Sequence, residues 1–316
     1  MHAYSGISYG VIFCLISAAF DVYVGYITQS ISPAVIILYC FISSTIVFLL
    51  FSILKQGIAV FYKAKANLPL LLLANVAVLL NWGGLIVSLR YLEPAIVGIA
   101  SVACGPAITT IISRCIDNRS GKNSGLEFII SWLIMVGVIL MLCNSLMGKS
   151  GVTTTTVDER LIGIICVILS ALGTVIYTFI SRELYQRQWE TYEILGFRNM
   201  LMLLIAVIYC FYADIPLSIN MNLAAPMVLL VVIGHLLPIY LIQNTIKRLQ
   251  PLHVSLVLLL LPVFTLLLQY FDTRVEISFD SIAAVSIIAI LLFILGINKI
   301  IGNPKQKGHN MKKSLL

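Results

Sequence analysis

The stretch GVIFCLISAAFDVYVGYI, residues 10–27, decides the fold, because the chain carries a second copy of it. It aligns without gaps on GIICVILSALGTVIYTFI, residues 163–180, where Gly10, Ser17 and Ala18 again meet glycine, serine and alanine. Each copy approaches the length of about 20 apolar residues with which a helix spans a membrane. The first copy lacks the basic start and the cleavage site of a signal peptide. We therefore expect a retained first span and an internal repeat of spans.

The composition extends this expectation to the whole chain. Hydrophobic residues make up 60% of the 316 residues, charged residues make up 10%, and the mean hydropathy is +1.04. A soluble domain carries about 25% charged residues, so this chain has too few charges to cover a water-facing surface. The apolar stretches predict an all-α polytopic membrane protein with ten spans, at residues 5–28, 33–54, 68–90, 94–116, 126–147, 160–181, 191–212, 223–243, 251–271 and 281–301.

A second pair of similar stretches indicates how the two halves are related. RYLEPAIVGIASVACGPAITT, residues 90–110, resembles KRLQPLHVSLVLLLLPVFTLL, residues 247–267. About five spans separate each stretch from its copy, and an odd number of spans inverts the second copy in the membrane. We predict a first five-span repeat at 1–147, a second, inverted repeat at 160–301 and a basic cytoplasmic tail at 302–316. The alternative is that apolar helices resemble one another by chance.

Lysine and arginine indicate the orientation of the chain. With a cytoplasmic N-terminus, 15 of the 20 basic residues fall in cytoplasmic loops or the tail, and 4 fall on the other side. Cytoplasmic loops of membrane proteins are enriched in these residues, so we expect both termini in the cytoplasm. The net charge of +7 is dispersed among the loops and forms no patch for nucleic acid.

Motifs for metal, nucleotide or catalytic chemistry are missing from the sequence. The seven cysteines lie in or at the ends of apolar spans without CxxC spacing, and there are only four histidines, so we predict no metal site and no cofactor. The strings HExxH and GxxxxGK[ST] do not occur. We predict that the chain is not an enzyme. A membrane-embedded enzyme is the first alternative, and a receptor or assembly protein is the second.

Two segments resemble a known family. The link between the third and fourth predicted spans reads SLRYLEPAIVGIASVACGPAITTIISR, and the seventh span reads EILGFRNMLMLL with Arg198 before its apolar run. Both are similar to the drug/metabolite transporter superfamily in its EamA-type ten-span form. The resemblance implies an exporter of an amino acid, a related metabolite or a small amphiphile, in a bacterial inner membrane. Its partners would be the small-molecule substrate and the lipid bilayer, and the carrier would be a monomer or a homodimer.

Ionisable residues within the spans are the sharpest candidates for a transport site. A charge at the bilayer centre costs about 2.5–3.5 kcal/mol on insertion scales, so it suggests a function. Asp21 lies in the outer half of the first span, His235 lies near the middle of the eighth, and Arg198 lies one or two turns into the seventh. Asp21 and His235 can each exchange a proton, which makes proton coupling a hypothesis. The alternatives are a structural hydrogen bond, a packed neutral histidine and an ion pair of Arg198 with Glu190 or Glu193.

Polar and small residues on the faces of corresponding spans complete the expected site. A central cavity between spans 1, 3, 4, 6, 8 and 9 would explain these stripes, although helix packing explains any single one. The further substrate-binding candidates are Ser17, Asn81, Trp82, Ser170, Thr174, Tyr177 and Gln269. Prolines inside helices and paired glycines permit bending, so the gating candidates are Pro106, Pro238, Pro262, Gly83 and Gly84. Together these features predict a secondary carrier that works by alternating access.

Overall fold

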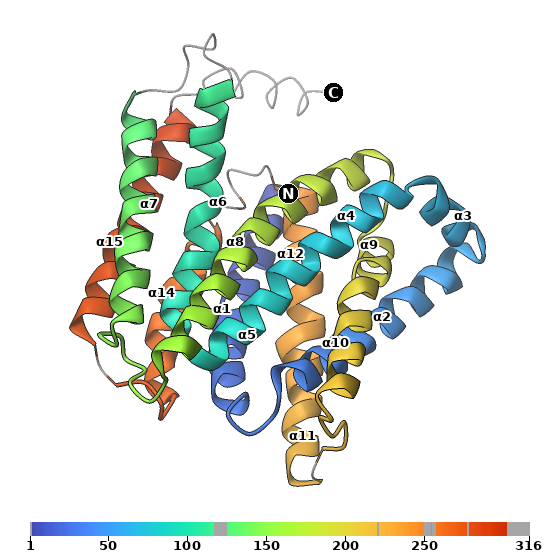
Figure 1. Ribbon diagram of the computed structural model, residues 1–316. Helices are drawn as coiled ribbons and strands as arrows, with labels where there is room; N and C mark the ends of the chain where they lie inside the picture. Colours follow the sequence, from blue (N-terminus) through green and yellow to red (C-terminus); the bar gives the residue numbers. More distant parts are fainter. Residues whose placement is uncertain are drawn as a thin grey trace.

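The computed structural model of the chain describes residues 2–116, 125–219, 221–249, 254, 257–276 and 278–301 (Figure 1). Within these ranges the protein is all-helical and has no strand. The predicted tail at 302–316 and most of the first residues of the predicted ninth span lie outside the described residues.

The first half of the chain contains five long helical segments and one short helix. The third segment is continuous through a π-helical turn, η1. In order, the elements are α1 (His2–Ile27), α2 (Pro33–Gln56), the short α3 (Ala59–Ala66), α4 (Leu68–Val78), η1 (Leu79–Gly83), α5 (Gly84–Tyr91), α6 (Pro94–Ile116) and α7 (Gly125–Leu146).

The second half repeats this layout, including a π-helical turn, η2, in its third segment. In order, the described elements are α8 (Val157–Gln186), α9 (Thr191–Phe197), α10 (Met200–Tyr212), α11 (Met221–Leu229), η2 (Leu230–Leu236), α12 (Leu237–Arg248), α14 (Leu260–Leu268), the 3₁₀ turn η3 (Gln269–Phe271) and α15 (Phe279–Ile301).

Local sequence signals account for several helix boundaries. Proline begins α2 at Pro33 and α6 at Pro94, where the missing N–H would have no helical partner anyway. A capping box begins α8: Thr156 accepts a hydrogen bond from the backbone of Glu159, whose carboxylate accepts one from the backbone of Thr156. Gly57 ends α2 with φ of 62°, a conformation that glycine adopts without steric cost.

The protein is an integral, multi-pass membrane protein. Eight helices among the described residues are long and apolar enough to cross a membrane, and two shorter apolar helices, Pro94–Gly105 and Leu260–Phe271, lie where the fourth and ninth spans are predicted. Large apolar side chains such as Leu54, Leu140 and Phe179 lie exposed on the outside of the bundle. Lipid is the solvent that such a surface requires.

The two π-helical turns lie in the middle of corresponding long helices. Each adds a residue to one helical turn, a local distortion that is often found at functional sites. Pro238 is the second residue after η2, and because proline donates no backbone hydrogen bond, the preceding turn can widen. The turns place Trp82 and His235, which the alignment of the two halves pairs with each other, side by side in the core, with ring centroids 5.4 Å apart.

Contacts between the halves recur at paired positions. A Cβ atom on Gly173 of α8 would lie 2.5 Å from the backbone nitrogen of Asn81 in η1. In the same register, Gly173 pairs with Phe20 of α1, and Asn81 pairs with Gly234 of η2. A Cβ atom on Gly234 would lie 2.8 Å from the ring of Phe20. The contact of α8 with η1 therefore has its counterpart between α1 and η2.

Another pair of close contacts lies at the ends of α5 and α12. A Cβ atom on Gly163 of α8 would lie 2.8 Å from the side chain of Leu92, after α5. Leu92 aligns with Leu249 in the second pair of similar stretches, and a Cβ atom on Gly6 of α1 would lie 2.8 Å from the side chain of Leu249. Small residues allow helices in a membrane to approach closely, so these glycines set where the halves cross.

A buried carboxylate accepts hydrogen bonds from three separate segments of the chain at one end of the bundle. Glu93, between α5 and α6, accepts hydrogen bonds from the backbone of Gly151 (2.8 Å), the amide of Gln269 (2.9 Å) and the hydroxyl of Ser281 (2.8 Å). Gln269 also accepts a hydrogen bond from the backbone N–H of Ala95. This set, the Glu93 network, joins residues that are far apart in the sequence.

Replacing Glu93 with alanine is expected to lower the free energy of unfolding by about 3 kcal/mol, because a buried donor without an acceptor costs about 1–3 kcal/mol and three donors lose theirs. Thermal unfolding of the purified protein in detergent measures the loss. Glu183→Ala is the matched control, since its ion pair with Arg187 is exposed and such pairs contribute about 0–1 kcal/mol. Equal unfolding temperatures for the two variants would contradict the conclusion that the Glu93 network stabilises the bundle.

Two ion pairs lie at the opposite end of the α4–α5 helix, and the first of them joins the first half to the second. Lys63 lies 2.7 Å from the buried carboxylate of Glu193, and Lys247 lies 2.6 Å from Glu190. Lys63 also lies over the ring of Trp189, 5.2 Å from its centroid. The bundle is thus held by polar contacts at both ends, with the apolar helices between them.

Candidate functional site

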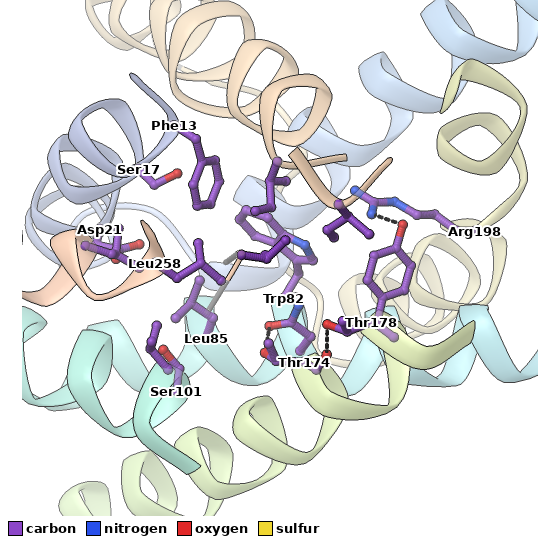
Figure 2. A pocket seen from close by; sticks show the side chains of 17 residues that line it. Phe13, Ser17, Asp21, Trp82, Leu85, Ser101, Thr174, Thr178, Arg198 and Leu258 are labelled. Carbon is purple, nitrogen blue, oxygen red and sulfur yellow. Dashed lines mark hydrogen bonds between the residues drawn. The ribbon is translucent and has the colours of Figure 1, made fainter. Parts of the chain in front are cut away.

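A cavity of about 100 Å³ lies at the centre of the bundle (Figure 2). Side chains from α1, η1, α5, α6, α8, α12 and α14 line it, together with Arg198 from the break between α9 and α10. Of the predicted substrate-binding candidates, those that line this cavity are Ser17, Asp21, Asn81, Trp82, Thr174, Tyr177 and Arg198.

Asp21 and Ser17 form one polar end of the cavity. They lie one turn apart on α1, and Asp21 is 2% exposed. Within the described ranges of the chain, the Asp21 carboxylate has no hydrogen-bond or ion-pair partner, and the buried Ser17 hydroxyl has none either. This end of the cavity therefore offers free acceptor atoms to a ligand.

Arg198 forms the other polar end. It follows α9 directly and is 1% exposed, with its guanidinium over the ring of Tyr177, 4.8 Å from the centroid. One guanidinium nitrogen donates to the Tyr177 hydroxyl, which donates to Gln243 Oε1 at 2.7 Å. Among the described residues, Nε and Nη2 of Arg198 have no hydrogen-bond partner, and neither does the amide nitrogen of Gln243. This end therefore offers free donors.

The ion pair of Arg198 with Glu190 or Glu193, which the sequence left open, is not formed. Glu193 pairs with Lys63, and Glu190 pairs with Lys247. No carboxylate among the described residues lies within ion-pair distance of the guanidinium. Arg198 thus brings an uncompensated positive charge to the cavity.

Asn81 connects the cavity to α8. Its side-chain oxygen accepts hydrogen bonds from Thr174 (3.0 Å) and Ser170 (3.3 Å). Thr174 lines the cavity, whereas Ser170 is buried between α8 and η1 and does not line it. Asn81 and Thr174 thus form one wall of the site, and Ser170 holds the Asn81 side chain from the helix contact behind it.

His235 lies behind this site. It is 0% exposed, and both ring nitrogens lack a hydrogen-bond partner. Three aromatic rings enclose it: Phe41 at 4.2 Å, Trp82 at 5.4 Å and Phe20 at 6.4 Å between ring centroids. Trp82 lines the cavity and separates it from the imidazole, so His235 touches the site only through this indole.

The predicted gating residues have different surroundings. Gly84 is wedged against the backbone of α8, whereas a Cβ atom on Gly83 would have 3.6 Å to its nearest neighbour, in Leu79. Pro262 of α14 faces Gly98 of α6, and Pro238 is buried after η2. Pro106 lies inside α6, and its side chain is outside the described part. Gly84 is thus a packing residue in this conformation.

Several site residues were not singled out from the sequence. Gln243 anchors Tyr177, and a polar residue in an apolar span was a signal that could have found it. The apolar lining carries no such signal, because its residues do not differ in type from those that face lipid. This lining consists of Phe13, Leu85, Val102, Ile242, Ile246, Val254, Leu258 and Leu261.

A second cavity, of about 520 Å³, lies between α2, the α4–α5 helix, α8 and α10. Its lining is mainly apolar, and neither Asp21 nor Arg198 faces it. Within the described residues, no group of three or more His, Cys, Asp or Glu side chains is placed to hold a metal ion. The central cavity is therefore the better candidate for a solute site.

Comparisons with known proteins agree with this arrangement. A solved crystal structure, described only as that of a protein, matches with a TM-score of 0.62 and 14% sequence identity, over 91% of this chain and 95% of the other. This likeness concerns the fold alone. No curated protein matches the sequence. Residues 161–298 match the model of the EamA-like transporter family. The second half of the chain thus carries an EamA-like transporter domain, consistent with a member of the drug/metabolite transporter superfamily.

Proposed function

We propose that the chain is a secondary carrier that exports a small organic solute, such as an amino acid or an amphiphilic compound, by alternating access around the central cavity. The EamA-like domain implies a membrane transporter of small solutes. The observation that carries the proposal is a cavity that both halves line and that holds two ionisable side chains, Asp21 and Arg198, without an ion-pair partner among the described residues. An ionisable residue inside a membrane bundle is expensive and marks a substrate or ion path.

Ten spans in two inverted repeats, at 1–147 and 160–301, are part of this proposal. The matched contacts of α8 with η1 and of α1 with η2 support it, because a twofold relation of the halves produces such pairs. The two π-helical turns at corresponding places support it further. In carriers of this type the repeats rock against each other around a site at mid-depth.

The proposed orientation puts both termini in the cytoplasm of a bacterial cell, with the carrier in the inner membrane. Lys63 and Lys247 lie at the end of the bundle that would face the cytoplasm. Arg274, which donates to the backbone oxygens of Leu89 and Arg90, lies at the other end. The excess of lysine and arginine in the cytoplasmic loops favours this direction.

Metabolite profiling of cells and medium tests the function. Cells that express the wild-type protein are expected to lose a solute from the cytoplasm and to gain it in the medium. Ser101→Trp, which fills the cavity from α6, is expected to abolish this shift at equal membrane abundance. An unchanged wild-type profile, or the same shift with the filled cavity, would contradict the proposal. A membrane-embedded enzyme would instead yield a converted solute, and a receptor or assembly protein would yield neither change.

A further inference from the structure

We infer that the carried solute is a zwitterion whose cationic and anionic groups lie at opposite ends, with an apolar chain or apolar side chains between them, such as a short peptide of apolar residues or an ω-amino acid. The inference rests on the proposed function and specifies its substrate. It assigns the cationic group to Asp21 and Ser17 and the anionic group to Arg198.

The central cavity contains one acidic and one basic side chain. Asp21 and Arg198 face the same space, and neither has an ionic partner within the part of the chain that the structure describes. A cationic solute would leave the Arg198 guanidinium uncompensated in a low-dielectric site, which is costly. An anionic solute would leave Asp21 and Ser17 without a donor, whereas a zwitterion pairs with both ends of the cavity.

The two ends of the cavity differ in their free hydrogen-bonding groups. At the Asp21 end, the carboxylate and the free Ser17 hydroxyl suit an ammonium group, which only donates. At the Arg198 end, Nε and Nη2 are free and suit a carboxylate, which Arg binds with two parallel hydrogen bonds. The polarity of the two ends therefore fixes which way the solute lies.

Apolar side chains separate the two polar ends of the cavity. Figure 2 shows Asp21 and Ser17 on one side of the cavity and Arg198 on the other, with Trp82, Leu85 and Leu258 between them. An α-amino acid carries both charges on one carbon and cannot extend across this apolar middle. A solute that spans it needs an apolar segment between its charges, which would lie against the indole and the leucines.

This assignment also explains how export could be coupled to protons. A carboxylate holds either a proton or a cationic group at one time, so Asp21 would release its proton when the solute binds. Exchange of one proton for one solute follows without a second titratable group. Proton entry would then drive the solute out of the cell.

Counterflow in proteoliposomes that contain the purified full-length chain tests the inference. The probes are leucyl-leucine, its N-acetyl form without the cation, its amide without the anion, and free leucine. For the wild-type protein, leucyl-leucine is expected to enter at least tenfold faster than each of the other three. In Asp21→Asn the preference over the N-acetyl form is expected to fall below twofold, and in Arg198→Gln the preference over the amide is expected to do so.

Asp214→Asn and Arg182→Gln are matched controls outside the cavity, and both are expected to keep the wild-type preferences. Uptake of a blocked form or of leucine as fast as the dipeptide would overturn the inference and leave the carrier function intact. If no probe enters while profiling identifies an exported solute of another kind, the inference alone is wrong. If no probe enters and profiling shows no displaced solute, both proposals are wrong.

Discussion

Replacing Gly84 with alanine is expected to cost the protein about 3 kcal/mol of stability or more, whereas the same change at Gly83 is expected to be nearly neutral. A Cβ atom at Gly84 would collide with the backbone oxygen of Cys166 and lie 3.1 Å from the backbone nitrogen of Ser170. Backbone atoms of a helix cannot move aside as a side chain can. At Gly83 the nearest atom is a flexible Leu79 methyl at 3.6 Å.

Thermal unfolding of the two variants, purified in detergent and compared with the wild type, measures this difference. The two glycines are neighbours on one helix, so insertion and helix propensity change equally in both variants. A loss of stability in Gly83→Ala as large as that in Gly84→Ala would show that α8 does not cross the α4–α5 helix at Gly84.

Replacing Asp21 with asparagine is expected to reduce transport driven by a pH gradient at least tenfold. An amide cannot take up or release a proton, and it cannot compensate a cation. An ionised group at this depth costs about 2.5–3.5 kcal/mol on insertion scales, and binding of a proton or a cation removes that cost. Uptake of the solute found by profiling, into proteoliposomes with an imposed pH gradient, measures the effect.

His235→Gln separates the two candidates for proton coupling. The His235 ring is enclosed by Phe20, Phe41 and Trp82 and does not line the cavity, so its loss is expected to leave the response to the pH gradient intact. Asp214→Asn, at an exposed turn, controls for the change of a carboxylate to an amide. The coupling proposal would fail if Asp21→Asn kept its response. It would move to His235 if only His235→Gln lost the response.

Much of the fold was predictable from the sequence, because the membrane imposes a simple requirement. Eight of the ten predicted spans coincide with apolar helices long enough to cross a membrane, and the described parts of the other two coincide with shorter apolar helices, since backbone groups in lipid must be paired within a helix. Two of these helices, Pro94–Gly105 and Leu260–Phe271, are shorter among the described residues than a full span, so the count of ten stays a prediction. The π-helical turns were not foreseen, since their sequences, LLNWG and LVVIGHL, follow no period that differs from an α-helix.

Cavity residues could be predicted from the sequence where the position of a polar residue within a membrane span is sufficient to place it away from lipid. Asp21, Arg198 and Trp82 line the cavity as expected, because charged and polar side chains within a span avoid lipid. Gln269, Ser170 and His235 do not line it. Gln269 bonds Glu93 at the end of the bundle, and Ser170 bonds Asn81 inside a helix contact. Whether a polar residue faces a cavity or a neighbouring helix depends on crossing angles, which single-span patterns do not contain.

The most direct test of alternating access is the labelling of a cysteine at position 17, placed by Ser17→Cys in a chain whose seven cysteines are replaced by alanine. Inside-out and right-side-out vesicles are treated with a membrane-impermeant maleimide, and Leu140→Cys, on the exposed face of α7, serves as the control. The cavity cysteine is expected to react from both sides of the membrane, and the control from neither. Reaction from one side only, or from neither side, would contradict a carrier that opens the central cavity alternately to each face.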